Sequence, residues 1–201
     1  MSKNLLMIFT RNPELGKVKT RLAKSLGDKK ALEIYKFLLN RTKEVTQQIS
    51  SDKAVFYSVK VRDNDIWDAT VFQKLQQEGD DLGERMQNAF TTAFSMGYEK
   101  VAIIGSDLYE LESHHIDEAF HQLNSNDVVI GPAEDGGYYL LAAKQVYPDV
   151  FNNKDWGTSS IREATLNDLK KQSVFLLPIL NDVDVVEDIR DHPAFTQFLK
   201  P

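Results

Sequence analysis

Residues 5–16 read Leu5-Leu6-Met7-Ile8-Phe9-Thr10-Arg11-Asn12-Pro13-Glu14-Leu15-Gly16. The first five are all apolar, which is typical of a strand buried on both faces, and the proline and glycine that follow indicate a loop. Strands of this kind are common in parallel sheets that helices cover on both faces. The stretch therefore points to an α/β fold.

The rest of the chain alternates between short apolar runs and segments with apolar residues at three- and four-residue steps. The predicted strands are residues 54–57, 101–104, 128–130 and 174–177. The predicted helices are residues 31–49, 81–97, 113–123 (with Ser113 as the cap) and 160–171. This order predicts a single domain over residues 1–201, a Rossmann-like three-layer α/β/α sandwich with a mostly parallel central sheet.

Composition and charge narrow the class of partner. The 201 residues include 24 basic and 30 acidic side chains, giving a net charge of −6, and no cysteine. A disulfide framework and a thiol nucleophile are therefore excluded, and the charge does not favour nucleic acid. The longest apolar run has six residues, 138–143, too short to span a membrane. We expect a cytoplasmic protein that acts on a small molecule. The sequence leaves a homodimer open.

The loop after the first strand has the ingredients of a phosphate site. It combines a glycine turn, spaced cations and the start of a helix, which together attract anions. The phosphate-binding candidates are Arg11, Gly16, Lys17, Lys19, Thr20 and Arg21. The pattern differs from a P-loop, and a solvated basic helix start is the alternative interpretation.

Carboxylates follow two other segments. Asp107 comes directly after the strand at 101–104 and Gly105-Ser106, at the edge of the sheet where loops gather. Asp182 and Asp184 would face the same way if their segment is extended. Such residues suit Mg²⁺ or Mn²⁺, which bind a few carboxylates together with water and phosphate oxygens. Asp107 could instead cap a helix, and the acidic run could be a solvated surface.

The acceptor-side candidates are Asp135, Gly136, Gly137 and Trp156. Paired glycines allow a ligand to approach the backbone, and an indole can stack on a base or sugar. A hairpin turn at 135–137 and a tryptophan that plugs the core edge are the alternatives.

Four segments in order resemble the radical-SAM- or selenodomain-associated transferases. This family is a branch of the GT-A nucleotide-diphospho-sugar transferase superfamily. The segments are Pro13-Glu14-Leu15-Gly16-Lys17-Val18-Lys19-Thr20-Arg21-Leu22-Ala23, Gly79-Asp80-Asp81-Leu82-Gly83-Glu84-Arg85-Met86, Gly105-Ser106-Asp107, and Gly131-Pro132-Ala133-Glu134-Asp135-Gly136-Gly137-Tyr138-Tyr139-Leu140. Asp182-Val183-Asp184 with Glu187-Asp188 is similar to an acidic segment of related cytidylyl- and guanylyltransferases. The resemblance spans nearly the whole chain.

The resemblance implies a transferase with a divalent cation at Asp107 and Asp184 and a nucleotide held by the first loop. Lys19, Arg21 and Asp107 would be catalytic. Because three cations suit a triphosphate, we expect a nucleotidyltransferase that moves a nucleoside monophosphate to a small phosphorylated or hydroxyl acceptor and releases pyrophosphate. A GT-A glycosyltransferase using a nucleotide sugar is the alternative.

The chain departs from the family pattern at two places, which are Leu108-Tyr109-Glu110 and Val185-Val186. They leave a third class open, a nucleotide-binding module without catalysis.

Overall fold

The computed structural model describes residues 2–199. Its centre is a seven-stranded sheet in the order β3-β2-β1-β4-β6-β5-β7. The strands are β1 (Asn4–Thr10), β2 (Asp52–Tyr57), β3 (Gln73–Gln76), β4 (Lys100–Ile104), β5 (Val128–Pro132), β6 (Tyr138–Ala143) and β7 (Val174–Leu176). Only β6 runs antiparallel to its neighbours within the described chain. The predicted mostly parallel sheet is confirmed.

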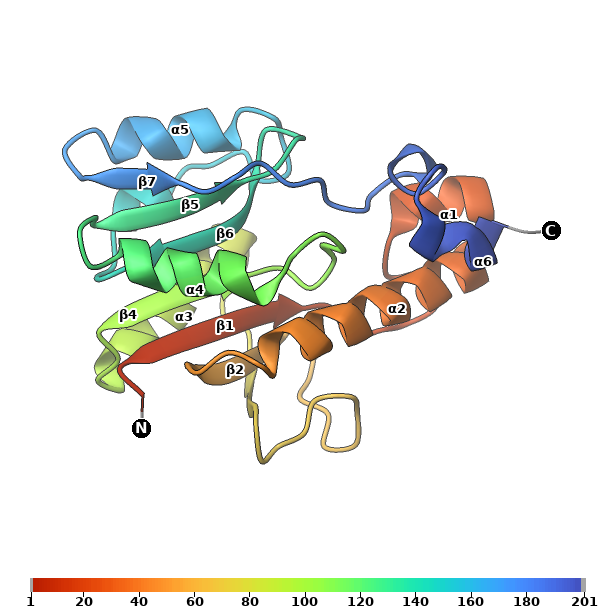
Figure 1. Cartoon of the computed structure of the whole chain (residues 1–201), viewed down its shortest axis with the longest axis horizontal. Coiled ribbons are helices and arrows are strands. Elements are labelled where there is room, and N and C mark those ends of the chain that lie inside the picture. Colours follow the sequence, from red (N-terminus) through yellow and green to blue (C-terminus); the bar gives the residue numbers. More distant parts are fainter. Residues whose placement is uncertain (1, 200–201) are drawn as a thin grey trace.

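Helices cover both faces of this sheet (Figure 1). They are α1 (Thr20–Leu26), α2 (Asp28–Thr46), α3 (Leu82–Ser95), α4 (Ser113–Gln122), α5 (Ile161–Asp168) and α6 (Thr196–Leu199). Helices α2 and α4 contribute to one apolar core with alternate strand residues such as Leu6 and Ile8. Helices α3 and α5 pack on the opposite face with Leu5 and Met7. This alternation is what a strand buried on both faces requires, and it gives the predicted three layers.

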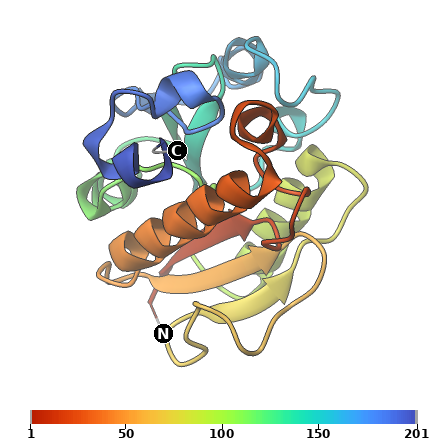
Figure 2. The same cartoon turned by 90° about the vertical axis from the view of Figure 1, so that its right-hand side faces the viewer.

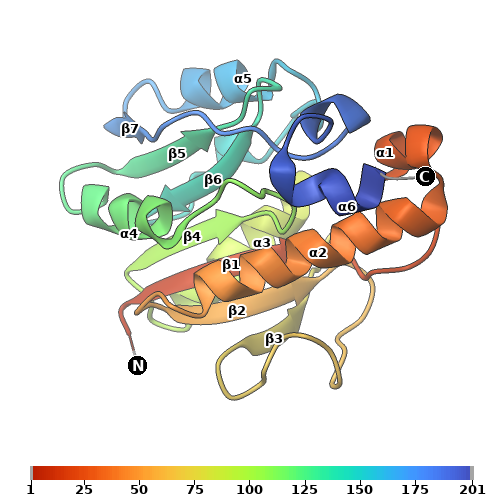
Figure 3. The ribbon, with the colours of Figure 1, turned by 45° about the vertical axis from the view of Figure 1, so that its right-hand side comes forward.

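Residues 183–199 form a separate small core over α1 and α2 (Figure 3). Val183, Ile189 and Phe195 pack there against Leu22 of α1 and against α2. We refer to residues 183–199 as the C-terminal tail. The tail carries the acidic segment back to the first loop, although the two lie more than 160 residues apart in sequence.

Two helix ends show where local sequence patterns succeed and fail. Asp81 caps α3 as predicted, with its carboxylate accepting a hydrogen bond from the Glu84 amide at 2.9 Å. The predicted cap of α4 is wrong, because Ser113 is the first residue of the helix and Glu112 is the cap. The Glu112 amide donates to His115 Nδ1 at 3.1 Å, so His115 replaces the expected acidic partner. Within residues 2–199, no helix is long and apolar enough to cross a membrane.

Candidate functional site

The predicted site segments converge at the carboxyl ends of the strands, as parallel sheets require. A cleft of about 1000 Å³ lies there, which we call the large cleft. Helix α2 runs alongside β1 and β2 on one face of the sheet, and the loop after β1 leads from the strand end to α1 (Figure 2). The phosphate-site candidates that line the large cleft are Arg11, Lys17, Lys19, Thr20 and Arg21. Gly16 is not among the lining residues. Its positive φ of 71° shapes the turn in which the Lys17 amide donates to the Glu14 carbonyl.

Lys19 is the most constrained residue of this loop. Its backbone lies in the left-handed region, with φ 48° and ψ 47°, a conformation that costs a non-glycine residue about 1–3 kcal/mol. Its ammonium group contacts an Asp107 carboxylate oxygen at 2.8 Å, and only 6% of the side chain is exposed. Burial favours the neutral amine, but the charge and hydrogen bond of Asp107, together with the charges of Asp184 and Asp182, outweigh it, so the pKa of Lys19 is raised. The residue is a fixed cation.

The other phosphate-site candidates of the loop are exposed. Lys17, Thr20 and Arg21 all lie on the open wall of the large cleft. Arg21 contacts Asp184 of the C-terminal tail at 2.8 Å, with 65% of the Arg21 side chain exposed. Helix α1 has only seven residues. Full side-chain charges, rather than the dipole of a long helix, must therefore attract an anion here.

Three carboxylates surround Lys19 from different parts of the chain. Asp107, Asp182 and Asp184 all line the large cleft. Asp107 follows β4, and its carbonyl accepts from the Val183 amide at 3.4 Å, which joins the two acidic segments. Because Val183 is buried, its neighbours Asp182 and Asp184 can both face the cleft. The predicted metal-binding candidates are therefore brought together. Among residues 2–199, however, no group of three His, Asp or Glu side chains is arranged so that it could hold a metal ion.

The two departures from the family pattern support this arrangement. Glu110 accepts a hydrogen bond from the Asn181 amide at 3.0 Å and so fixes the segment that carries Asp182. Tyr109 packs against Phe37 and Phe195 in the small core. At the second departure, the Asp188 carboxylate accepts from the amides of Asp184 and Val185, both at 2.7 Å. Glu110 within the first altered segment and Asp188 beside the second thus hold the acidic residues in place.

Asp182 has a strongly altered acidity. Burial, followed by repulsion from Asp135 and Asp107, raises the pKa of Asp182 to about 6. Folding thus makes this carboxyl harder to ionise. Its contribution to the free energy of unfolding therefore falls as the pH rises from about 4 to about 6. At pH 7.5, the ionised Asp182 destabilises the folded state.

In EDTA, Asp182→Asn is expected to raise the free energy of unfolding at pH 7.5 by about 1–2 kcal/mol, a range reduced for solvent screening of this partly exposed group. The gain should shrink at pH 4.5, where the carboxyl is largely protonated in the folded protein. Urea titrations at both pH values measure the difference. Asp191→Asn, on the exposed side of the C-terminal tail, is the control. A gain that stays constant with pH would contradict this prediction.

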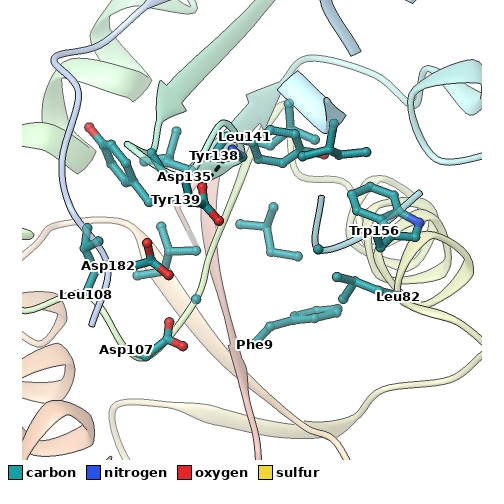
Figure 4. Close-up of a pocket in the computed structure, with 18 of the residues that line it drawn as sticks. Phe9, Leu82, Asp107, Leu108, Asp135, Tyr138, Tyr139, Leu141, Trp156 and Asp182 are labelled. Carbon is teal, nitrogen blue, oxygen red and sulfur yellow. Dashed lines mark hydrogen bonds between the residues drawn. The ribbon is translucent and has the colours of Figure 1, made fainter. Parts of the chain in front are cut away.

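A second cavity adjoins the large cleft (Figure 4). Its volume is about 250 Å³, and we call it the apolar pocket. Asp135, Gly137 and Trp156, three of the four acceptor-side candidates, line it. Gly136 lines neither cavity. It has a φ of 90°, and a Cβ there would lie 2.3 Å from the Ser159 carbonyl oxygen, so its role is close backbone packing.

Sequence reasoning missed a polar network at the base of the large cleft. Tyr35 on α2 was counted only as part of an apolar stripe. Its hydroxyl lies 3.2 Å from Thr10 Oγ1 and 3.3 Å from Ser106 Oγ, and it accepts from the Arg11 amide at 2.9 Å. The network ties the loops after β1 and β4 together. The available signal was the phenolic hydroxyl of Tyr35 within a mostly apolar helix face.

Known proteins share this fold, and two of them also share a quarter to a third of the aligned residues. One similar crystal structure is that of a protein from Desulfovibrio desulfuricans G20, which is described as a nucleotide-diphospho-sugar transferase. It matches with a TM-score of 0.86 and 31% sequence identity, and the match covers 97% of this chain and 90% of that protein. A 2-phospho-L-lactate guanylyltransferase of Methanocaldococcus vulcanius is 26% identical over 92% of this chain and 82% of the relative. The 4-diphosphocytidyl-2C-methyl-D-erythritol synthase of Anaerococcus prevotii DSM 20548 shares the fold, with a TM-score of 0.60 and 10% identity over 97% of both chains.

Fold, cleft and homologues together define a transferase of the nucleotide-diphospho-sugar transferase type. The family can be stated more closely. Residues 41–158, more than half of the chain, match the model of DUF2064, described as an uncharacterized protein conserved in bacteria, and the chain belongs to that family. The α/β transferase expected from the sequence is confirmed. The narrower resemblance to radical-SAM- or selenodomain-associated transferases stays a prediction.

Proposed function

We propose that the protein is a metal-dependent nucleotidyltransferase. It moves a nucleoside monophosphate from a nucleoside triphosphate to a small acceptor and releases pyrophosphate. The observation that carries this proposal is the convergence in one cleft of exposed cations, the fixed ammonium of Lys19 and three carboxylates. The guanylyltransferase relatives agree with it. Within the same proposal, the protein is cytoplasmic, acts without nucleic acid and belongs to the radical-SAM- or selenodomain-associated branch.

In this proposal the triphosphate lies against the loop after β1. Lys17, Thr20 and Arg21 on the exposed wall bind the outer phosphates, and Arg11 contributes further positive charge. Lys19 faces the phosphorus that is attacked. Because its ammonium is already fixed, it can stabilise the charge that develops in the transition state without reorganising.

Mg²⁺ or Mn²⁺ fits the carboxylate side of the cleft. Asp107, with Asp182 or Asp184, would supply one or two oxygen ligands, and the rest would come from water and phosphate, as Mg²⁺ prefers. The raised pKa of Asp182 agrees with this, because repulsion from Asp135 and Asp107 contributes to it after burial, and a cation would relieve that repulsion. The metal would neutralise charge on the phosphates when bound. The protein holds those carboxylates through Glu110 and Asp188.

The proposed transfer is a displacement at the α-phosphorus of the triphosphate. An acceptor oxygen forms a bond to the α-phosphorus, and the bond from this phosphorus to the bridging oxygen breaks. Pyrophosphate leaves with that electron pair. A phosphate acceptor needs no proton transfer, whereas a hydroxyl acceptor would lose its proton to a carboxylate such as Asp135 at the junction of the two cavities.

Nucleotide binding should be visible as a thermal shift. With Mg²⁺, the preferred triphosphate at 100 times its dissociation constant is expected to stabilise the protein by about 2.7 kcal/mol, which is a shift of several degrees. We expect the four triphosphates to differ, and EDTA to remove most of the effect. Pyrophosphate release with an acceptor pool then tests transfer. A protein that no triphosphate stabilises, with or without metal, would contradict the proposal.

One observation favours a second candidate. The Desulfovibrio desulfuricans relative is described as a nucleotide-diphospho-sugar transferase, which fits a glycosyltransferase that holds a nucleotide sugar in the same cleft. The two reactions differ in their leaving group. Pyrophosphate release supports nucleotidyl transfer, and nucleoside diphosphate release from a nucleotide sugar supports glycosyl transfer.

A further inference from the structure

The apolar pocket has no positive charge on its walls. Within residues 2–199, no Lys, Arg or His side chain lines it. Its charged lining residues are Asp107, Asp135 and Asp182, and all three also line the large cleft, so they mark the junction of the two cavities. Arg162 lies on the neighbouring helix α5, and its guanidinium donates to the Ala133 carbonyl at 3.1 Å. A negative group deep inside the pocket would therefore be desolvated without a cationic partner.

The walls are apolar and already in place. Leu82 and Met86 come from α3, Tyr138 from β6, and Trp156 from the loop before α5 (Figure 4). The Trp156 indole packs closely on α3, because a Cβ on Gly83 would lie only 2.7 Å from its Nε1 atom. Tyr138 meets the same indole edge to face at 6.4 Å between ring centroids. These contacts fix the wall in the absence of a ligand.

The pocket also exposes apolar surface that a ligand could cover. Leu82, in the first turn of α3, is 44% exposed. It lines both cavities and lies between them. Leu108, from the loop that carries Asp107, is buried against the same cavity. A volume of about 250 Å³ suits one ring or a short branched chain rather than a whole nucleotide.

We infer that the acceptor has an apolar body and no anionic group other than the one that attacks the nucleotide. This inference rests on the proposed nucleotidyl transfer and names its acceptor class. The apolar body lies among Leu82, Met86 and Trp156. The attacking oxygen lies at the junction beside Asp107, where the Lys19 ammonium, 2.8 Å from that carboxylate, supplies the positive charge that the inner pocket lacks. 2-Phospho-L-lactate, the molecule in the relatives' name, carries a carboxylate besides its phosphate and fits this pocket poorly.

Binding of defined probes tests this class. The probes are benzyl phosphate, 3-methylbutyl phosphate and 2-phospho-L-lactate, with benzyl alcohol as the hydroxyl counterpart. Each is titrated calorimetrically into protein with Mg²⁺ and a non-hydrolysable analogue of the triphosphate that gives the largest thermal shift, and into protein alone. An apolar probe is expected to bind at least tenfold more tightly than 2-phospho-L-lactate. Equal or tighter binding of 2-phospho-L-lactate, or no binding of the apolar probes, would overturn the inference.

Two variants locate the effect. Trp156→Ala is expected to weaken benzyl phosphate about tenfold and to leave the nucleotide shift unchanged. Leu176→Ala, an exposed apolar residue on β7 outside both cavities, is the matched control. Leu82→Lys adds a cation at an exposed position and should move the preference toward 2-phospho-L-lactate. An unchanged preference in folded Trp156→Ala and Leu82→Lys proteins would place the probes elsewhere and refute the assignment.

A failure of the proposed function can be distinguished from a failure of this inference. It would appear as the absence of a nucleotide shift and of pyrophosphate release. The probe preference measured in protein alone does not depend on either readout.

Discussion

Lys19→Ala is expected to reduce the rate of nucleotidyl transfer about 10³-fold, with a smaller effect on the stability of the fold. The substitution removes a cation that is fixed before the reaction, and such groups commonly contribute two to three orders of magnitude to a rate. Lys19 meets this condition because its side chain is buried and held at 2.8 Å from Asp107. Single-turnover rates with the preferred triphosphate measure the loss.

The matched control for this prediction is Lys24→Ala. It removes the same charge from α1 at an exposed position that does not line the large cleft. Asp107→Asn provides a second test, because it should lower both the rate and the metal dependence of nucleotide binding while keeping a hydrogen-bond partner for Lys19. A Lys19→Ala protein that retains transfer within tenfold of the unmodified protein would refute the assigned role.

Phe195→Ala is expected to lower the free energy of unfolding by about 3–5 kcal/mol, as for other fully buried phenylalanines. Phe195 is only 1% exposed, and its ring meets Phe37 at 5.4 Å and Tyr109 at 5.1 Å between centroids. The substitution leaves a cavity between the C-terminal tail and α2. Urea titration gives the change in stability.

The same substitution should loosen the acidic side of the site. Val183 and Ile189 pack in the core that Phe195 completes, so their amides are expected to exchange faster with solvent. Phe195→Leu fills most of the cavity and should recover most of the loss. Phe94→Ala, on α3 and away from the tail, is the control for local effects. A stability change under 1 kcal/mol would show that the tail does not depend on this ring.

The strands that could be predicted are those with a continuous run of apolar residues. The apolar runs at β1, β2, β4 and β5 have few alternatives to a buried strand. Strand β3 was missed because Gln73-Lys74-Leu75-Gln76 has no apolar pattern. These residues form a strand because they pair with β2 in the folded protein. The place of β6 between β4 and β5 depends on the whole sheet and cannot be read locally.

The residue types of the candidate site could be predicted from the sequence, but most of its geometry could not. Strand ends indicated the positions of Asp107 and the first loop, because parallel strands gather their following loops at one edge. The left-handed backbone of Lys19 carried no signal, since that conformation usually selects glycine or asparagine. The pairing of Arg21 with Asp184 depends on packing of the tail, which only the folded chain provides.

The tail has a consequence for protein synthesis. Residues 183–199 leave the ribosome after all seven strands, yet they hold Asp184 against Arg21 and close the small core over α1. A nascent chain can form the sheet through β7 before this happens. The cleft therefore exists first without the part of its wall that carries Asp184, and it acquires that part only when translation has passed the tail.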